Sequence, residues 1–173
     1  CSEWSPEAIR LPVNPRVLAK GIAAFKARAV GTVPDAGLGQ FIVRGFMPKR
    51  HHFVCRAAET SIAKAKRWLF QAFVGPRDAG VEKARWVNKL IGLGPGLTPS
   101  GDDFLGGMMI ALRAIGEHGL CSQLWPEIYQ SAAVSTNPIS FTHLKAASEG
   151  MGSECIHRAI SDMIGGNAEA VSG

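Results

Sequence analysis

The sequence lacks a long hydrophobic run. Its longest strongly apolar stretch, residues 104–112, covers nine positions, whereas a helix needs about 20 to cross a bilayer. No basic segment followed by an apolar stretch stands near the N-terminus, so no signal peptide is in view. We therefore expect a protein with no membrane partner and a cytoplasmic location.

Cysteine is also scarce, with Cys1, Cys55, Cys121 and Cys155 too far apart for a CxxC motif. A disulfide framework does not suit a chain this long and apolar, so we interpret these residues as reduced thiols. The chain has 173 residues, of which 46% are hydrophobic and 19% are charged. These values are typical of one globular domain, and we expect residues 1–173 to form a single helical domain.

Acidic residues are few in the first part of the chain. Residues 1–100 contain 16 Lys and Arg against 6 Asp and Glu, net +10, while residues 101–173 contain 3 against 8, net −5. A basic half can indicate nucleic acid binding, but here the basic residues are scattered and no aromatic recognition motif accompanies them. We expect a solvated basic face, or a rim that attracts a small anionic substrate, and no nucleic-acid partner.

The spacing of apolar residues predicts helices over most of the chain, namely 15–30, 57–73, 78–92, 102–115, 122–134, 136–150 and 153–166. Segment 41–47 differs, because its β-branched residues weakly favour a strand. The helix over 102–115 is apolar on nearly all sides and should lie at the centre. The prediction is a mainly α fold, with about six to seven helices around a buried central helix at about 102–115 and at most a small strand element near 41–47. Glycine inside a helix lowers its stability, so Gly106 and Gly107 suggest that another group packs very close to the backbone there.

A loop rich in glycine and proline precedes the central helix, in the stretch "IGLGPGLTPSGDDFLGGMMIAL" from residue 91 to 112. Gly96 and Gly101 have the glycine spacing of a P-loop, but Asp102 stands where the lysine is required. The GxGxxG spacing of a dinucleotide site is absent as well. The loop is therefore neither of these two phosphate-binding motifs.

Two interpretations of this loop stay open from the residues alone. In the first, Ser100 and Asp103 form a capping box and the loop is a tight turn between helices. In the second, the loop is a site, because Thr98, Ser100, Asp102 and Asp103 are more polar groups than a cap requires. A bound anion would then need a Lys or Arg from the basic half, or Mg²⁺ held by Asp102 or Asp103. The carboxylates can instead hold the amide or amine of a neutral substrate.

Two segments resemble a known bacterial family, which includes the H subunit of the oxamate carbamoyltransferase of anaerobic allantoin degradation. The first is "GLGPGLTPSGDDFLGG" at 92–107, and the second is "TNPISFTHLKAASEG" at 136–150. The second fits the family pattern at Thr136, Ser140, Leu144, Ala147 and Gly150. Members of the family also carry an N-terminal portion, so the resemblance implies that this chain is the C-terminal part of a longer one.

The resemblance implies a transferase subunit of purine catabolism, which works with other carbamoyltransferase subunits to move a carbamoyl group between carbamoyl phosphate and oxamate. The alternative is a non-catalytic ligand-binding or assembly subunit with a structural loop. We expect His143, on the second segment, to face away from the site. The candidate catalytic residues are Ser100, Asp102 and Asp103, and the candidate substrate-binding residues are Gly94, Gly96, Thr98, Gly101, Thr136 and Ser140.

Overall fold

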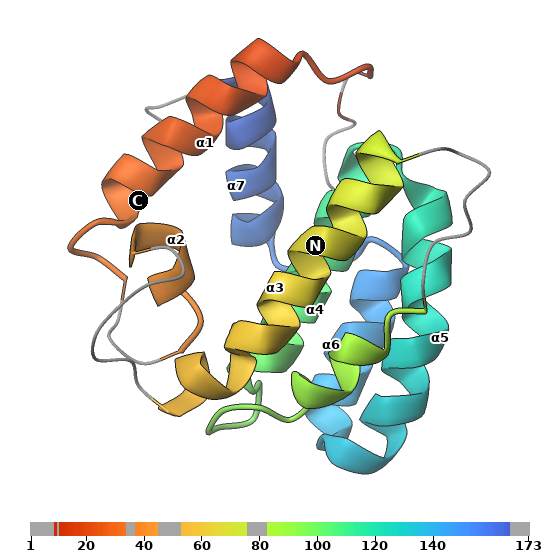
Figure 1. The fold of residues 1–173 in the computed structure, drawn as a ribbon. Coiled ribbons are helices and arrows are strands. Elements are labelled where there is room, and N and C mark those ends of the chain that lie inside the picture. Colours follow the sequence, from red (N-terminus) through yellow and green to blue (C-terminus); the bar gives the residue numbers. More distant parts are fainter. Residues whose placement is uncertain (1–8, 10, 34–36, 45–52, 76–82, 167–173) are drawn as a thin grey trace, which may run out of the picture.

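The computed structural model describes residues 9, 11–33, 37–44, 53–75 and 83–166. In this part of the chain seven α-helices and one short 3-10 helix form, and no strand does, which confirms the mainly α prediction (Figure 1). The elements are α1 (Pro15–Ala29), α2 (Gln40–Arg44), α3 (Phe53–Val74), η1 (Arg85–Lys89), α4 (Ser100–Ala114), α5 (His118–Ser135), α6 (Pro138–Ser148) and α7 (Glu154–Gly165).

Side-chain caps explain where two of the helices begin. The Asn14 carboxamide accepts hydrogen bonds from the first backbone amides of α1, with Pro15 at the first helical position. Asn137 does the same for α6, where Pro138 follows it. Such caps satisfy amides that have no partner within the helix. The start predicted for the helix at 136–150 is thereby confirmed.

Two local predictions are wrong. Residues 41–44 lie in α2 rather than in a strand, and residues 45–47 lie outside the described part of the chain. A helix satisfies its own backbone groups, whereas a strand needs a neighbour to pair with. In the segment 78–92, whose first residues also lie outside, only Arg85–Lys89 is helical, as η1. The backbone of Gly92 has φ 70° and ends this segment.

Helix α4 lies at the centre of the domain, as predicted, and contacts α5, α6 and α7. Its Leu105 and Met109 are fully buried. Helices α1 and α7 pack together at one side, while α3, α5 and α6 surround α4 at the other (Figure 1). None of the helices in the described ranges combines the length and the apolar character needed to cross a membrane.

The closest backbone approach does not occur at the glycine pair inside α4. A Cβ on Gly106 would lie 3.6 Å from the Cβ of Ala147, an ordinary contact, and a Cβ on Gly107 would meet nothing within 4 Å. The expectation of a very close neighbour there is wrong. The tight position is Gly101, where a Cβ would overlap the carbonyl of Leu90. The first turn of α4 is therefore pressed against the end of the η1 segment.

Candidate functional site

The loop before α4 has a fixed shape. Gly92, Gly94 and Gly96 have φ values of 70°, 119° and 97°, a region that favours glycine. The Gly101 amide donates to the Leu93 carbonyl over 2.9 Å and closes the loop at its base. The Asn137 side chain donates to the Leu97 carbonyl over 2.9 Å and ties the tip of the loop to the start of α6.

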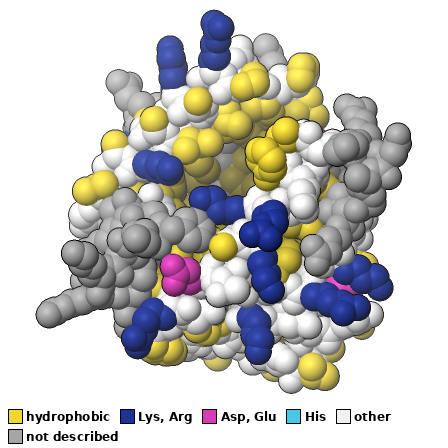
Figure 2. All heavy atoms as spheres, in the orientation of Figure 1, with side chains coloured by type: hydrophobic (Ala, Val, Ile, Leu, Met, Phe, Trp, Pro, Cys, Tyr) yellow, Lys and Arg dark blue, Asp and Glu magenta, His cyan; other side chains and the backbone are white. Residues whose placement is uncertain are grey.

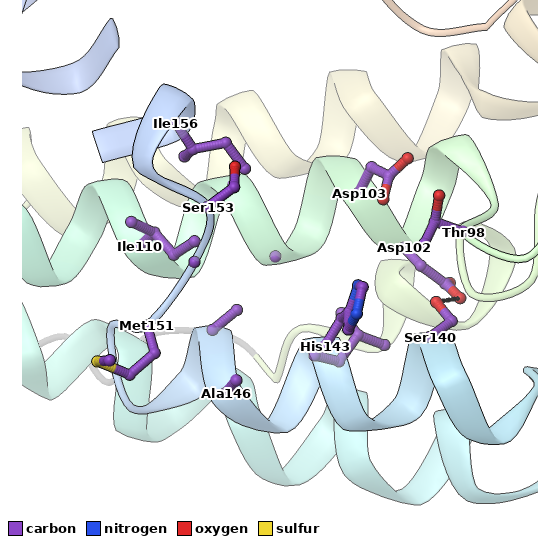
Figure 3. A pocket seen from close by; sticks show the side chains of 15 residues that line it. Thr98, Asp102, Asp103, Ile110, Ser140, His143, Ala146, Met151, Ser153 and Ile156 are labelled. Atoms are coloured by element: carbon purple, nitrogen blue, oxygen red, sulfur yellow. Dashed lines mark hydrogen bonds between the residues drawn. The ribbon is translucent and has the colours of Figure 1, made fainter. Parts of the chain in front are cut away.

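Asp102 joins the loop to α6 through a buried carboxylate that is 2% exposed. One oxygen accepts the Gly92 amide over 2.8 Å. The other accepts a hydrogen bond from the hydroxyl of Ser140 over 2.6 Å (Figure 3) and one from the hydroxyl of Thr136. The two segments that resemble the carbamoyltransferase family are thus bonded to each other at one carboxylate.

The capping box predicted for the start of α4 does not form. The helix begins at Ser100 with Pro99 at the N-cap position and no side-chain cap. The amides of Asp102 and Asp103 donate to the Pro99 carbonyl, and the Gly101 amide donates to Leu93. These amides of the first turn already have acceptors, so a ligand at this helix end would have to be recognised mainly by side chains.

A first cavity of about 600 Å³ lies between α4, α6 and the chain entering α7. Most of its polar groups gather at one end, where His143 on α6 and Asp103 on α4 line the space together with Thr98 (Figure 3). The other end is mainly apolar, lined by Ile110, Met151 and Ile156, with the hydroxyl of Ser153 beside them. A space with few, convergent polar groups on an apolar wall suits a small-molecule ligand.

A second cavity of about 800 Å³ lies on the other side of α4, bounded by α1, residues 37–42 and α3. Figure 2 shows a hollow with apolar walls between α1 and α3. Lys26 and Lys66 contribute positive charge to its lining, and Ser100 contributes a hydroxyl. Asp103 and Gly107 line both cavities. The carboxylate of Asp103 therefore lies where the two spaces meet.

The pKa of Asp103 is raised above its ordinary value of 3.8. Burial is the main cause and the negative charge of Asp102 adds to it, while His143 acts in the opposite direction. A carboxylate with a raised pKa accepts a proton more readily than one with the ordinary pKa. A general base works best when its pKa lies near the working pH. Asp103 thus has the environment expected of a group that takes part in proton transfer.

The same shift predicts how Asp103→Asn affects stability. A carboxyl group whose pKa is higher in the folded state destabilises that state once it is ionised, since the unfolded chain ionises it more easily. At neutral pH we expect Asp103→Asn to melt at a higher temperature than the parent. The difference should disappear as the pH falls below about 4, where both states hold the proton. Thermal melts from pH 3 to pH 8 measure this, and a difference that does not depend on pH would contradict it.

Comparison with known proteins adds to this picture. Residues 90–173 match the family model described as oxamate carbamoyltransferase subunit AllH. This match covers the C-terminal portion of the chain and contains both segments, 92–107 and 136–150, on which the resemblance rests. No curated protein and no solved structure matches the chain.

The AllH match contains the glycine loop, residues 92–103, and helices α4 to α7. Every residue that lines the first cavity therefore lies within it. Lys26 and Lys66, in the second cavity, lie outside it. The loop, the Asp102 hydrogen bonds and the first cavity thus form one unit of the AllH-matching portion.

The structure places the predicted site residues in different surroundings. Thr98, Asp102, Asp103 and Ser140 line the first cavity, and Ser100 and Asp103 line the second. The remaining candidates line neither and have local contacts instead: Gly94 lies against Ser100, Gly101 against Leu90, Thr136 against Asp102, and Gly96 has open space around its Cα. Their assignment to substrate stays a prediction.

Sequence reasoning missed His143, which lines the first cavity. The available signal was its spacing, because residues three apart on a helix share a face and Ser140 was already a candidate. The sequence predicts that a bound anion would need a Lys or Arg from the basic half of the chain, but it does not identify Lys26 or Lys66.

The carboxylates of Asp102 and Asp103 do not form a good Mg²⁺ site. Both oxygens of Asp102 accept N–H or O–H groups, which leaves Asp103 as the free carboxylate. In the described ranges, no three His, Cys, Asp or Glu side chains are grouped as metal ligands. Mg²⁺ prefers several oxygen ligands in near-octahedral geometry, so one carboxylate offers a weak site.

Proposed function

We propose that this chain is a subunit of an oxamate carbamoyltransferase of allantoin degradation, and that the first cavity, beside the glycine loop, is its small-molecule site. The observation that carries the proposal is that Asp103 and His143 both line the polar end of that cavity, where the charge of His143 acts on the Asp103 carboxyl group. The AllH match over residues 90–173 supplies the reaction class. We further propose that residues 1–173 form one domain of a longer chain.

The proposed reaction moves a carbamoyl group from carbamoyl phosphate to the amide nitrogen of oxamate. A C–N bond forms at the carbamoyl carbon, the C–O bond to phosphate breaks, and the attacking nitrogen loses a proton. Asp103 is placed to accept that proton because its pKa is raised by burial. His143 is placed to donate a hydrogen bond to a substrate oxygen. Asp102 positions the loop through its hydrogen bonds and takes no part in the proton transfer.

Charge decides where the phosphate of the substrate would lie. No Lys or Arg among the described residues lines the first cavity, and Asp103 would repel a dianion there. Lys26 and Lys66 line the second cavity, which meets the first at Asp103. We therefore assign the phosphate to the Lys26 and Lys66 side of Asp103, and the oxamate amide to the His143 side.

Activity of the complex reconstituted with its partner subunits tests this proposal. We expect Asp103→Asn and His143→Gln each to lower the rate by about 10²-fold or more, the range for loss of a proton-transfer group. The control is Glu127→Gln, which removes a carboxylate on α5 that lines neither cavity and should leave the rate unchanged. Full activity in both folded site variants would contradict a catalytic role for this cavity.

A non-catalytic subunit is the second candidate, and one surface feature favours it. Leu97, Val134 and Ile139 are 66%, 84% and 46% exposed. Leu97 is tied to Asn137, so these side chains belong to the same end of the domain. Exposed apolar groups that gather in one place are typical of a protein interface.

Calorimetry separates the two candidates. The 173-residue chain alone and the partner subunits alone are titrated with oxamate, oxalurate and carbamoyl phosphate. Binding to this chain that Asp103→Asn weakens supports the proposed site. Binding to the partner subunits only supports an assembly role.

A further inference from the structure

A third cavity, of about 600 Å³, lies between α3 and η1. It shares no residue with the other two, and all its lining residues precede the AllH-matching portion. Among the described residues that line it, five side chains are cationic and none is acidic: Lys64 and Arg67 from α3, and Lys83, Arg85 and Lys89 from the η1 segment. By comparison, Lys26 and Lys66 are the only Lys or Arg side chains among the described residues that line the first and second cavities.

Such a group of like charges is unfavourable without a counter-charge. Cationic groups that surround one concave space raise the local positive potential and attract anions. Figure 2 shows Lys and Arg side chains gathered over α3 and the neighbouring η1 region, with few acidic side chains between them. A single phosphate would balance only part of five positive charges, whereas two or three linked phosphates would balance most of them.

Trp86 provides a second, independent sign of a ligand. Its side chain lines the cavity and is 7% exposed, so it is more than nine-tenths buried. Its Nε1–H has no hydrogen-bond acceptor among the described residues. Buried N–H groups nearly always have an acceptor in native structures. Because Trp86 lines the cavity, we assign the missing acceptor to an oxygen-rich ligand there, which the indole would have to turn to meet.

The tryptophan rings themselves offer little surface for a planar ligand. Trp68 and Trp86 pack edge to face, with their centroids 6.2 Å apart, and Trp68 is only 4% exposed. A nucleobase would find almost no ring face to stack on. Recognition therefore falls to the charged groups and the indole N–H, which bind phosphate oxygens.

We propose that this third cavity binds a chain of two or three condensed phosphates, either free or as the tail of a nucleoside triphosphate. Lys64, Arg67, Lys83, Arg85 and Lys89 neutralise the phosphates, and the Trp86 indole donates a hydrogen bond to a phosphate oxygen. This binding is separate from carbamoyl transfer, because none of these residues lines the first or second cavity.

Titration of the 173-residue chain with tripolyphosphate, ATP and adenosine at about 150 mM salt tests the proposal. Calorimetry and tryptophan fluorescence report binding, the latter because Trp68 and Trp86 adjoin the cavity. We expect tripolyphosphate and ATP to bind with similar micromolar affinity and adenosine not to bind. Weak binding of ATP beside strong binding of tripolyphosphate identifies the free polyphosphate as the ligand, and the reverse order identifies the nucleotide.

The matched variants compare equal losses of charge. The double variant Lys64→Gln/Arg85→Gln removes two charges from the cavity, and Lys20→Gln/Lys145→Gln removes two exposed charges that line no cavity. We expect the first pair to weaken tripolyphosphate binding at least tenfold and the second to leave it unchanged. Equal weakening by both pairs, no binding at millimolar tripolyphosphate, or tighter binding of an RNA oligonucleotide than of tripolyphosphate would overturn the proposal.

Discussion

Replacing Asp102 with alanine is expected to lower the free energy of unfolding by about 3–5 kcal/mol, because three hydrogen-bond donors lose a charged acceptor. The carboxylate is 2% exposed and accepts three hydrogen bonds, from the Gly92 amide and from the hydroxyls of Thr136 and Ser140. Alanine leaves all three donors without an acceptor, and each buried unsatisfied donor costs about 1–3 kcal/mol. The loop and α6 would also lose their bond to each other.

Urea unfolding of the parent and the variant measures this loss. The neighbouring Asp103→Ala is the control, since that side chain is exposed and its removal should not lower the free energy of unfolding. Ser140→Ala should cost about 1–2 kcal/mol alone and clearly less in the Asp102→Ala background, because the two residues share one hydrogen bond. A loss below about 1 kcal/mol for Asp102→Ala would show that the carboxylate does not hold the loop.

Gly107→Ala is expected to have opposite effects on stability and on binding. A Cβ at Gly107 meets no atom within 4 Å, and the residue lies inside α4 with helical geometry. Alanine should therefore raise the free energy of unfolding by up to about 1 kcal/mol, the difference in helix propensity. The added methyl group enters the lining that the first and second cavities share. We expect binding of oxamate or carbamoyl phosphate, and activity in the complex, to fall at least tenfold.

Gly119→Ala is the matched control for this variant. Gly119 lies near the start of α5, a Cβ there also meets nothing within 4 Å, and the residue lines none of the three cavities. It should not lower stability and should leave binding and activity intact. If Gly107→Ala keeps full activity, the substrate does not lie along this part of α4.

The sequence predicts the helices of this fold well where their ends are local features. Asn137 and Pro138 start α6, and Gly166 ends α7 in a left-handed conformation, with φ 71°. These signals act over a few neighbouring residues, so they can be identified without the tertiary structure. The central place of α4 follows in the same way from its apolar character on nearly all sides.

The interactions at the candidate site depend on contacts distant in sequence. The sequence names Asp102, Thr136 and Ser140 as candidate site residues, but it predicts neither the hydrogen bonds between them nor the bond from the Gly92 amide to Asp102 that ties the loop down. Ser100 and Asp103 matched a capping box, yet the fold places Pro99 at the N-cap and turns Asp103 toward the cavities. Local propensity was overridden there by tertiary contacts.

The hydrogen bonds at the base and tip of the glycine loop bear on the thermodynamics of ligand binding. Leu93 and Leu97 are bonded through their carbonyls to Gly101 and Asn137, and the three positive-φ glycines leave the backbone few alternatives. A loop that is ordered before the ligand arrives loses little conformational entropy when the ligand binds. The glycine loop thus acts as a preorganised wall rather than a closing lid, and a ligand in the first cavity should bind without a slow closing step.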